Sequence, residues 1–386
     1  PKGNFQAAHI ELYEPGFHKR NFKLDFSSFY PSIAMALNLG ADTTRIVGYE
    51  DYIPELEYDG SFIYIPDDKI GKRLKIQVDT DRRSCLYEMS KQFKELRAPY
   101  KALMTKEAIS KSNALKVMVN TFYGSNTNPY INYGDMSVGV TITSVARFLL
   151  LSAIELIRSK YGEKSVVYCH TDGINTNADV DVVWLTKRLR LILENKIPFA
   201  DTAWIEMDKD VYKEGYWVQI GNYVLRNEDG SLITHGSNFK ASTRSQFYKS
   251  TLSRIIDMRL DNTVNQGIID SLYDFEHVVL EDFLQRRSLN RPYESYKSET
   301  DMLIGLIEQG KCLGIEPLEG TAYHYYKTKG GYTLAEIVND KSELDVTYYW
   351  NIISNLLKKF HLDVWVKKNA PLTLIDKKQK SLMEWI

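Results

Sequence analysis

The chain of 386 residues is 44% apolar and 26% charged, and its formal net charge is −1. These values indicate a globular protein of two or three domains. The sequence shows no secretory signal and no run of about 18 uninterrupted apolar residues, which argues against a membrane protein. Its three cysteines, Cys85, Cys169 and Cys312, form no metal-ligand cluster and no even disulfide set. We therefore expect a reducing cytoplasm, that of the host if the protein is viral.

The first candidate site residue follows a short strand. Residues 22–24 form an apolar, β-prone run, and Pro31 closes the turn before the helix-like residues 32–37. Asp25 is therefore expected at the end of a strand. A lone aspartate at such a position is most often a turn or cap residue, so Asp25 needs a partner elsewhere in the chain.

A basic segment comes next. Lys94, Arg97 and Lys101 recur at helical spacing, and an arginine there could bind phosphate oxygens through two hydrogen bonds. Pro99 interrupts the spacing, because a proline inside a helix removes a hydrogen bond, so the helix either kinks or starts there. The alternative is that these charges form only a solvated helix face.

A second helical segment has two different faces. Lys116, Asn120 and Tyr123 lie at i, i+4 and i+7 and therefore share one face. The opposite face carries residues that can pack in a core: Leu115, Val119 and Phe122. Lys116 could neutralise the oxygens of a triphosphate, and Tyr123 offers a flat surface for a base pair.

A hairpin is predicted further along the chain. Residues 165–169 and 174–177 flank residues 170–173, which read His-Thr-Asp-Gly. The Asp-Gly pair favours a tight turn with a positive φ at Gly173, which would leave Asp172 at the tip.

Asp25 and Asp172 thus form a candidate pair of carboxylates on two strand-like segments. Hard divalent cations prefer oxygen ligands, and two such ions can hold the attacking and leaving oxygens of an in-line displacement. The pair predicts a site for two Mg²⁺ ions, with Mn²⁺ as a substitute, and a nucleotidyl-transfer reaction.

These segments, in this order, resemble the motifs of family B DNA polymerases. Residues 25–32 (DFSSFYPS) resemble motif A, residues 116–124 (KVMVNTFYG) resemble motif B, and residues 168–173 (YCHTDG) resemble motif C. The resemblance implies an α+β right-hand polymerase fold. Such a fold has an antiparallel palm sheet backed by helices, two-helix fingers and a mostly helical thumb.

The resemblance also implies roles for single residues. Asp25 and Asp172 would be the catalytic, metal-binding carboxylates, and Tyr30 would be a steric gate that excludes a 2′-hydroxyl, unless it is simply a buried core tyrosine. The implied nucleotide-binding residues are Phe26, Ser28, Phe29, Tyr30, Arg97, Lys101, Lys116, Asn120 and Tyr123. The implied DNA-binding residues are Gly124, Thr171, Tyr223 and Lys240.

A third acidic cluster, residues 206–210 (EMDKD), resembles the acidic palm strand near the metals of this family. It makes Asp210 a candidate third metal ligand, with Asp208 as the next choice. Tyr223 matches the tyrosine of the family's lysine-x-tyrosine element, but isoleucine and glycine fill the lysine positions. The sequence therefore does not predict the contact of that lysine with the primer end, although Lys240 could touch the DNA backbone.

Motif C departs from the family pattern at two positions. His170 stands where the family has the first aspartate of Asp-Thr-Asp, and Gly173 replaces the usual serine. Because histidine is a poor Mg²⁺ ligand, we expect His170 to be a structural neighbour of the site and not a ligand.

The motifs divide the chain into polymerase domains. Residues 1–80 and 127–243 are expected to form the palm, residues 81–126 the fingers and residues 244–386 the thumb. A helix over residues 141–161 is expected to back the palm sheet. Helical periodicity in the expected thumb covers residues 247–260 and 346–360.

Only 24 residues precede Asp25, and no exonuclease motif is visible. We expect either a shortened chain or, preferably, a split phage enzyme whose exonuclease and N-terminal part is a separate subunit. The intervals between motifs leave little room for the insertions of protein-primed polymerases, which favours a nucleic-acid primer.

The expected function is DNA-directed DNA polymerase in phage DNA replication. Its expected partners are primer-template DNA, dNTP, the separate subunit and a processivity factor, with no membrane. One alternative is a catalytically silent module that binds primer-template or scaffolds a replisome. An RNA-synthesising or RNA-templated polymerase is disfavoured by Tyr30 and by the lack of a Tyr-x-Asp-Asp hairpin.

Overall fold

The computed structural model of the protein describes residues 9–68, 70–103, 105–128, 130, 134–237, 239, 244–296 and 301–367. The chain folds as two compact units, one up to Lys213 and one from Glu214 onward. Each unit has an apolar core of its own, as expected of separate domains.

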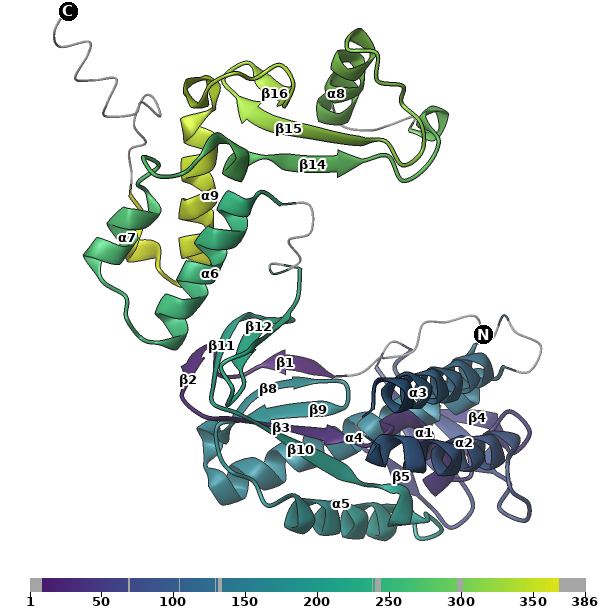
Figure 1. The fold of residues 1–386 in the computed structure, drawn as a ribbon. Coiled ribbons are helices and arrows are strands. Elements are labelled where there is room, and N and C mark those ends of the chain that lie inside the picture. The colour runs from purple at the N-terminus through teal and green to yellow at the C-terminus, as the bar shows by residue number, and fades with distance from the viewer. Residues whose placement is uncertain are drawn as a thin grey trace, which may run out of the picture. The chain divides into compact units, whose positions relative to one another are not determined.

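The first unit contains a five-stranded antiparallel sheet in the order β1-β8-β9-β3-β10 (Figure 1). Its strands are β1 (Ile10–Leu12), β3 (Asn21–Phe26), β8 (Val166–His170), β9 (Gly173–Thr176) and β10 (Met207–Tyr212). The central strand β3 carries Asp25, and the β8–β9 hairpin beside it carries Asp172. Strands far apart in sequence therefore bring the two candidate carboxylates to one sheet.

Side chains alternate across β3, as the strand geometry requires. Leu24 and Phe26 are buried, whereas Lys23 and Asp25 point to the other, more open face. The buried face packs on helices α4 (Met136–Tyr161) and α5 (Val182–Lys196), which cover one side of the sheet (Figure 1).

Helix α4 is the helix that the sequence predicts behind the sheet. It begins at Met136, where the Asp135 side chain accepts a hydrogen bond from the Ser137 N–H and so caps the helix. The helix has the length and apolar composition of a membrane span, but 67% of its most apolar window is buried inside the protein. This burial is typical of a core helix.

The first unit also has a second antiparallel sheet, in the order β4-β7-β6-β5. Its strands are β4 (Thr44–Asp51), β5 (Glu57–Tyr58), β6 (Ile63–Asp67) and β7 (Lys72–Val78). The remaining elements before this sheet are strand β2 (Gly16–His18) and helix α1 (Phe29–Ala36). Helix α1 follows β3 directly and packs into the same core.

Two helices, α2 (Cys85–Ala102) and α3 (Lys106–Thr127), pack against each other and correspond to the two-helix segment that the sequence predicts. The side chains of Ser84 and Thr105 cap their N-termini. Helix α2 continues through Pro99, so the proline does not mark a new helix start.

The second unit begins with the antiparallel strands β11 (Glu214–Gln219), β12 (Asn222–Arg226) and β13 (Leu232–His235). Helices α6 (Gln246–Leu260), α7 (Gln266–Leu272) and α9 (Val346–Lys359) share its main core. A sheet of β14 (Gln285–Ser288), β15 (Ala322–Thr328) and β16 (Gly331–Leu334) packs on helix α8 (Asp301–Cys312). The predicted helices at 247–260 and 346–360 are present, whereas the β14–β16 sheet adds strands that the helical periodicity did not indicate.

Candidate active site

The β8–β9 hairpin places Asp172 at its tip, as the sequence predicts. The expected positive φ at Gly173 is wrong, because Thr171 takes it instead, with a φ of 58°. Gly173 is a strand residue that pairs with His170 in the ladder. The glycine still matters for Asp25, since a Cβ at position 173 would lie 2.6 Å from the Oδ1 atom of Asp25 and would force the carboxylate to turn.

Strand pairing places the backbone of Asp25 beside this hairpin tip. Asp25 lies opposite Gly173 on β9 and opposite Asp208 on β10. The Phe26 N–H donates a hydrogen bond of 2.9 Å to the Asp172 carbonyl oxygen. The strand that carries the start of motif A and the turn of motif C are therefore held together by the main chain itself.

The charge of one carboxylate affects the other. Partial burial and the neighbouring Asp25 carboxylate raise the pKa of Asp172, although its side chain is open to solvent on one side. Lys23 and Lys116 act in the opposite direction and lower it. Two carboxylates that repel each other and offer only hard oxygen atoms are suited to a divalent cation, so the residues fit Mg²⁺.

The other candidate ligands lie on β10. Asp208 faces Asp25 across the strands, and Asp210 faces Lys23. Burial alone would raise the pKa of Asp208, but hydrogen bonds from the Ser27 hydroxyl and the Lys101 ammonium lower it.

Within the part of the chain that the structure describes, Asp25, Asp172 and Asp210 do not form a triplet with ligand atoms all within 4.8 Å of one another. Such a triplet occurs in the second unit, at Asp274, Glu276 and His277. Exposed acidic groups of this kind are common without a metal, and the sequence motifs do not include these residues.

A cavity of about 850 Å³ opens over the carboxylates. Most of the residues predicted from the motifs line it: Asp25, Phe26, Ser28, Phe29, Tyr30, Arg97, Lys101, Lys116, Asn120, Tyr123, Thr171, Asp172 and Asp210. Gly124 does not line this cavity, Tyr223 lies on β12 of the second unit, and Lys240 lies outside the described residues. The structure thus gathers residues from motifs A, B and C around one space.

Tyr30 lies inside this space, next to the carboxylates. Its ring centroid is 5.1 Å from that of Tyr123 and 6.1 Å from that of Phe29. Burial raises the pKa of Tyr30, and the nearby negative charge of Asp172 raises it further. Tyr30 is therefore a partly buried side chain in the wall of the cavity, with two aromatic neighbours.

A comparison with known protein families decides to which family the chain belongs. The sequence profile of the family described as "DNA polymerase family B" matches residues 2–195, which is more than half of the chain. The chain belongs to DNA polymerase family B. The resemblance of the three motifs to this family is thereby confirmed.

Relatives and solved structures agree with membership of this polymerase family. A DNA polymerase of Thermococcus sp. (strain 9oN-7) is 22% identical over 90% of this chain and 44% of its own length. DNA polymerase 2 of Aeropyrum pernix is 25% identical over 90% of this chain and 43% of its own length. The family B DNA polymerase of Pyrobaculum calidifontis superposes with a TM-score of 0.63 at 20% identity, covering 95% of this chain and 48% of that one. The α+β polymerase fold is thus confirmed, and the chain spans less than half the length of the relatives it matches.

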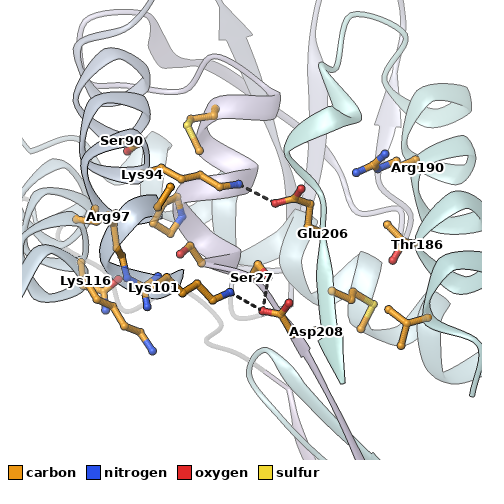
Figure 2. Close-up of a pocket in the computed structure, with 18 of the residues that line it drawn as sticks. Ser27, Ser90, Lys94, Arg97, Lys101, Lys116, Thr186, Arg190, Glu206 and Asp208 are labelled. Carbon is orange, nitrogen blue, oxygen red and sulfur yellow. Dashed lines mark hydrogen bonds and ion pairs between the residues drawn. The ribbon is translucent and has the colours of Figure 1, made fainter. Parts of the chain in front are cut away.

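In this family B chain, two of the basic residues of α2 form ion pairs with acidic residues at and just before the start of β10. The Lys94 ammonium bonds Glu206 at 3.0 Å, and the Lys101 ammonium bonds Asp208 at 3.2 Å (Figure 2). Arg97 instead donates to the carbonyl and hydroxyl oxygens of Ser112 on α3. These contacts surround a second cavity of about 540 Å³ that shares Arg97, Lys101 and Lys116 with the first.

Two polar residues of this site are not among those that the motifs predict. Ser27 donates a 2.8 Å hydrogen bond to Asp208, and Lys23 lies 2.6 Å from Asp25. The contact between Lys23 and Asp25 is predictable from the sequence, because strand residues two apart share one face of a sheet. The contact between Ser27 and Asp208 joins residues 181 positions apart, and short motifs do not show such pairs.

Proposed function

We propose that this chain is the polymerase module of a DNA-directed DNA polymerase, which adds deoxynucleotides to a primer 3′-hydroxyl opposite a template base. The observation that carries the proposal is the common cavity. It brings Asp25 and Asp172 together with the cations Arg97, Lys101 and Lys116 of the two-helix segment. Carboxylates that suit metal ions and cations that suit a triphosphate are the two halves of a phosphoryl-transfer site.

In this proposal Asp25 and Asp172 hold two Mg²⁺ ions, for which Mn²⁺ can substitute, and Asp210 is an auxiliary ligand. When bound, the ions would supply charge stabilisation for the attacking and leaving oxygens. Lys116, Arg97 and Lys101 would neutralise the triphosphate, and their action is positioning and electrostatic stabilisation. Lys101 must then leave Asp208, an exposed ion pair of the kind that contributes little stability.

The partners of this module follow from the same reasoning. Primer-template DNA and dNTP are the proposed substrates, with Thr171 of the hairpin tip, Gly124 of α3, Tyr223 and Lys240 as the proposed DNA contacts. Phage DNA replication, a separate exonuclease subunit and a processivity factor remain predictions that rest on the sequence resemblance alone. The palm, fingers and thumb boundaries at residues 80, 126 and 243 are likewise proposals.

Primer extension tests the proposal directly. The chain is incubated with a primed DNA template, Mg²⁺ and deoxynucleotides, and in parallel with ribonucleotides and with an RNA template. We expect Mg²⁺-dependent extension with deoxynucleotides on DNA. A chain that binds primer-template but extends no primer under these conditions would instead be a silent binding module.

We expect His170→Asp to leave the rate of extension unchanged or to raise it. His170 ends β8, pairs with Gly173 and Ile10 in the ladder, and has an exposed side chain whose ring lies 6.3 Å from that of Tyr168. An aspartate there would add a hard oxygen ligand near Asp172. The measurement is single-turnover extension at saturating Mg²⁺, and a loss of more than about tenfold would show that the imidazole itself has a role in the reaction.

A further inference from the structure

Among the described residues, Asp25 forms an ion pair with Lys23. Its ammonium lies 2.6 Å from the Oδ2 atom of Asp25, and the two side chains are 30% and 29% exposed. Both residues lie on β3 and, two positions apart, share the open face of the sheet. The pair is therefore in the wall of the cavity and not in the apolar core.

Lys23 also lies among the other carboxylates of the site. Asp210 faces it directly across β3 and β10. Its positive charge extends to Asp172, whose pKa it lowers. The ammonium group thus bonds the Asp25 carboxylate, acts electrostatically on the Asp172 carboxylate, and lies on the strand position opposite Asp210.

The Asp25 carboxylate is held from two sides. Lys23 bonds Oδ2, while Oδ1 lies against Gly173, so close that a Cβ on Gly173 would be only 2.6 Å away. The carboxylate can keep this orientation only because residue 173 has no side chain. The replacement of serine by glycine in motif C and the presence of a lysine two residues before Asp25 therefore belong to one local arrangement.

We propose that Lys23 is a built-in counterion of the Asp25 and Asp172 carboxylates, which competes with divalent metal ions for Asp25 and so sets the metal concentration that the site requires. The ammonium and the metal ion need the same oxygen, and like charges close together repel each other in a partly desolvated cavity. The inference rests on the proposed function, because the metal site is part of it. The alternative is that the ion pair only stabilises the fold, in which case its removal would leave the metal affinity unchanged. Partly exposed pairs contribute little to stability.

The test is direct binding of Mn²⁺ to the full chain, measured by electron paramagnetic resonance without DNA and without nucleotide. We expect Lys23→Met to lower the dissociation constant for Mn²⁺ about five- to tenfold, because a competing and repelling charge is removed. Lys23→Arg keeps the charge and is expected to stay within about twofold of the parent chain.

A matched control is available in the second sheet of the first unit. Lys75 on β7 is 28% exposed, nearly the same as Lys23, but it pairs with Glu50 at 3.9 Å and does not line the cavity over the carboxylates. Lys75→Met should therefore leave the dissociation constant within about twofold, which separates the local effect from a general change in charge. Thermal unfolding of each variant confirms that it is folded.

The variant Asp25→Asn shows which part of the measured Mn²⁺ binding occurs at the Asp25 and Asp172 carboxylates. If the parent chain binds Mn²⁺ and Asp25→Asn removes that binding, while Lys23→Met does not tighten it, the counterion role is wrong and the proposed polymerase site stands. If no Mn²⁺ binding depends on Asp25, both the counterion role and the metal site of the proposed function are overturned.

Discussion

Replacing either Asp25 or Asp172 with asparagine is expected to lower the rate of Mg²⁺-dependent primer extension by about 10³-fold or more. Each substitution keeps the shape of the side chain but removes one of the two negative charges that face each other at the end of β3 and the tip of the β8–β9 hairpin. The remaining carboxylate would still offer oxygen atoms, but it could not hold two divalent ions.

The measurement is single-turnover extension of a labelled primer, together with binding of the same primer-template. Binding of primer-template should change little, because the proposed role of these residues is to hold metal ions and not to contact the DNA backbone. Asp179→Asn is a suitable control, since Asp179 is also an acidic residue that pairs with a lysine of the same sheet, Lys209, but does not line the cavity around Asp25. An Asp172→Asn variant that retains more than about a tenth of the parent rate would contradict the two-carboxylate mechanism.

The centre of the site could be predicted because its residues lie in short contiguous motifs. Asp25, Lys116 and Asp172 each belong to a segment whose strand or helix is visible from its periodicity, and the cavity brings these segments together. The two-faced helix was also predictable. In α3, Lys116 and Asn120 are exposed toward the cavity, whereas Val119 is 7% exposed.

The features that could not be predicted depend on pairing between distant strands. Gly173 was assigned a turn conformation from the Asp-Gly dipeptide, but the ladder with His170 makes it a strand residue, and its lack of a side chain serves Asp25 instead. The contact of Lys101 with Asp208 joins α2 to β10 across 107 positions. Neither dipeptide preference nor helical spacing contains that information.

The strands of the second unit show the same limit. β15 is rich in tyrosine and carries a Gly-Gly turn after it, which is a hairpin signal. The helical pattern of α6 and α9 on both sides outweighed it, because a short strand gives a weaker periodic signal than a helix of four turns.

Tyr30→Ala is expected to weaken discrimination against ribonucleotides by about 10²-fold, measured as the ratio of kcat/KM for a deoxynucleotide to that for the matching ribonucleotide. Exclusion by bulk works only if the side chain cannot move aside. Tyr30 is held by its neighbours Tyr123 and Phe29, and Pro31 fixes the backbone in the first turn of α1, where its missing N–H costs no helical hydrogen bond. The ring therefore presents a fixed surface inside the cavity that also holds Asp25 and Asp172.

The matched control for this gate is Tyr30→Phe. It removes only the hydroxyl and keeps the ring, so discrimination by bulk should stay within about threefold of the parent chain. If Tyr30→Phe lost discrimination as fully as Tyr30→Ala, the hydroxyl would be the selective group, acting by hydrogen bonding and not by steric exclusion. If neither variant changed the ratio while both still extended DNA primers, Tyr30 would be a packing residue of the α1 turn. The surface that rejects the 2′-hydroxyl would then have to be sought on another aromatic side chain of the cavity, first on Tyr123, whose ring is 5.1 Å from that of Tyr30.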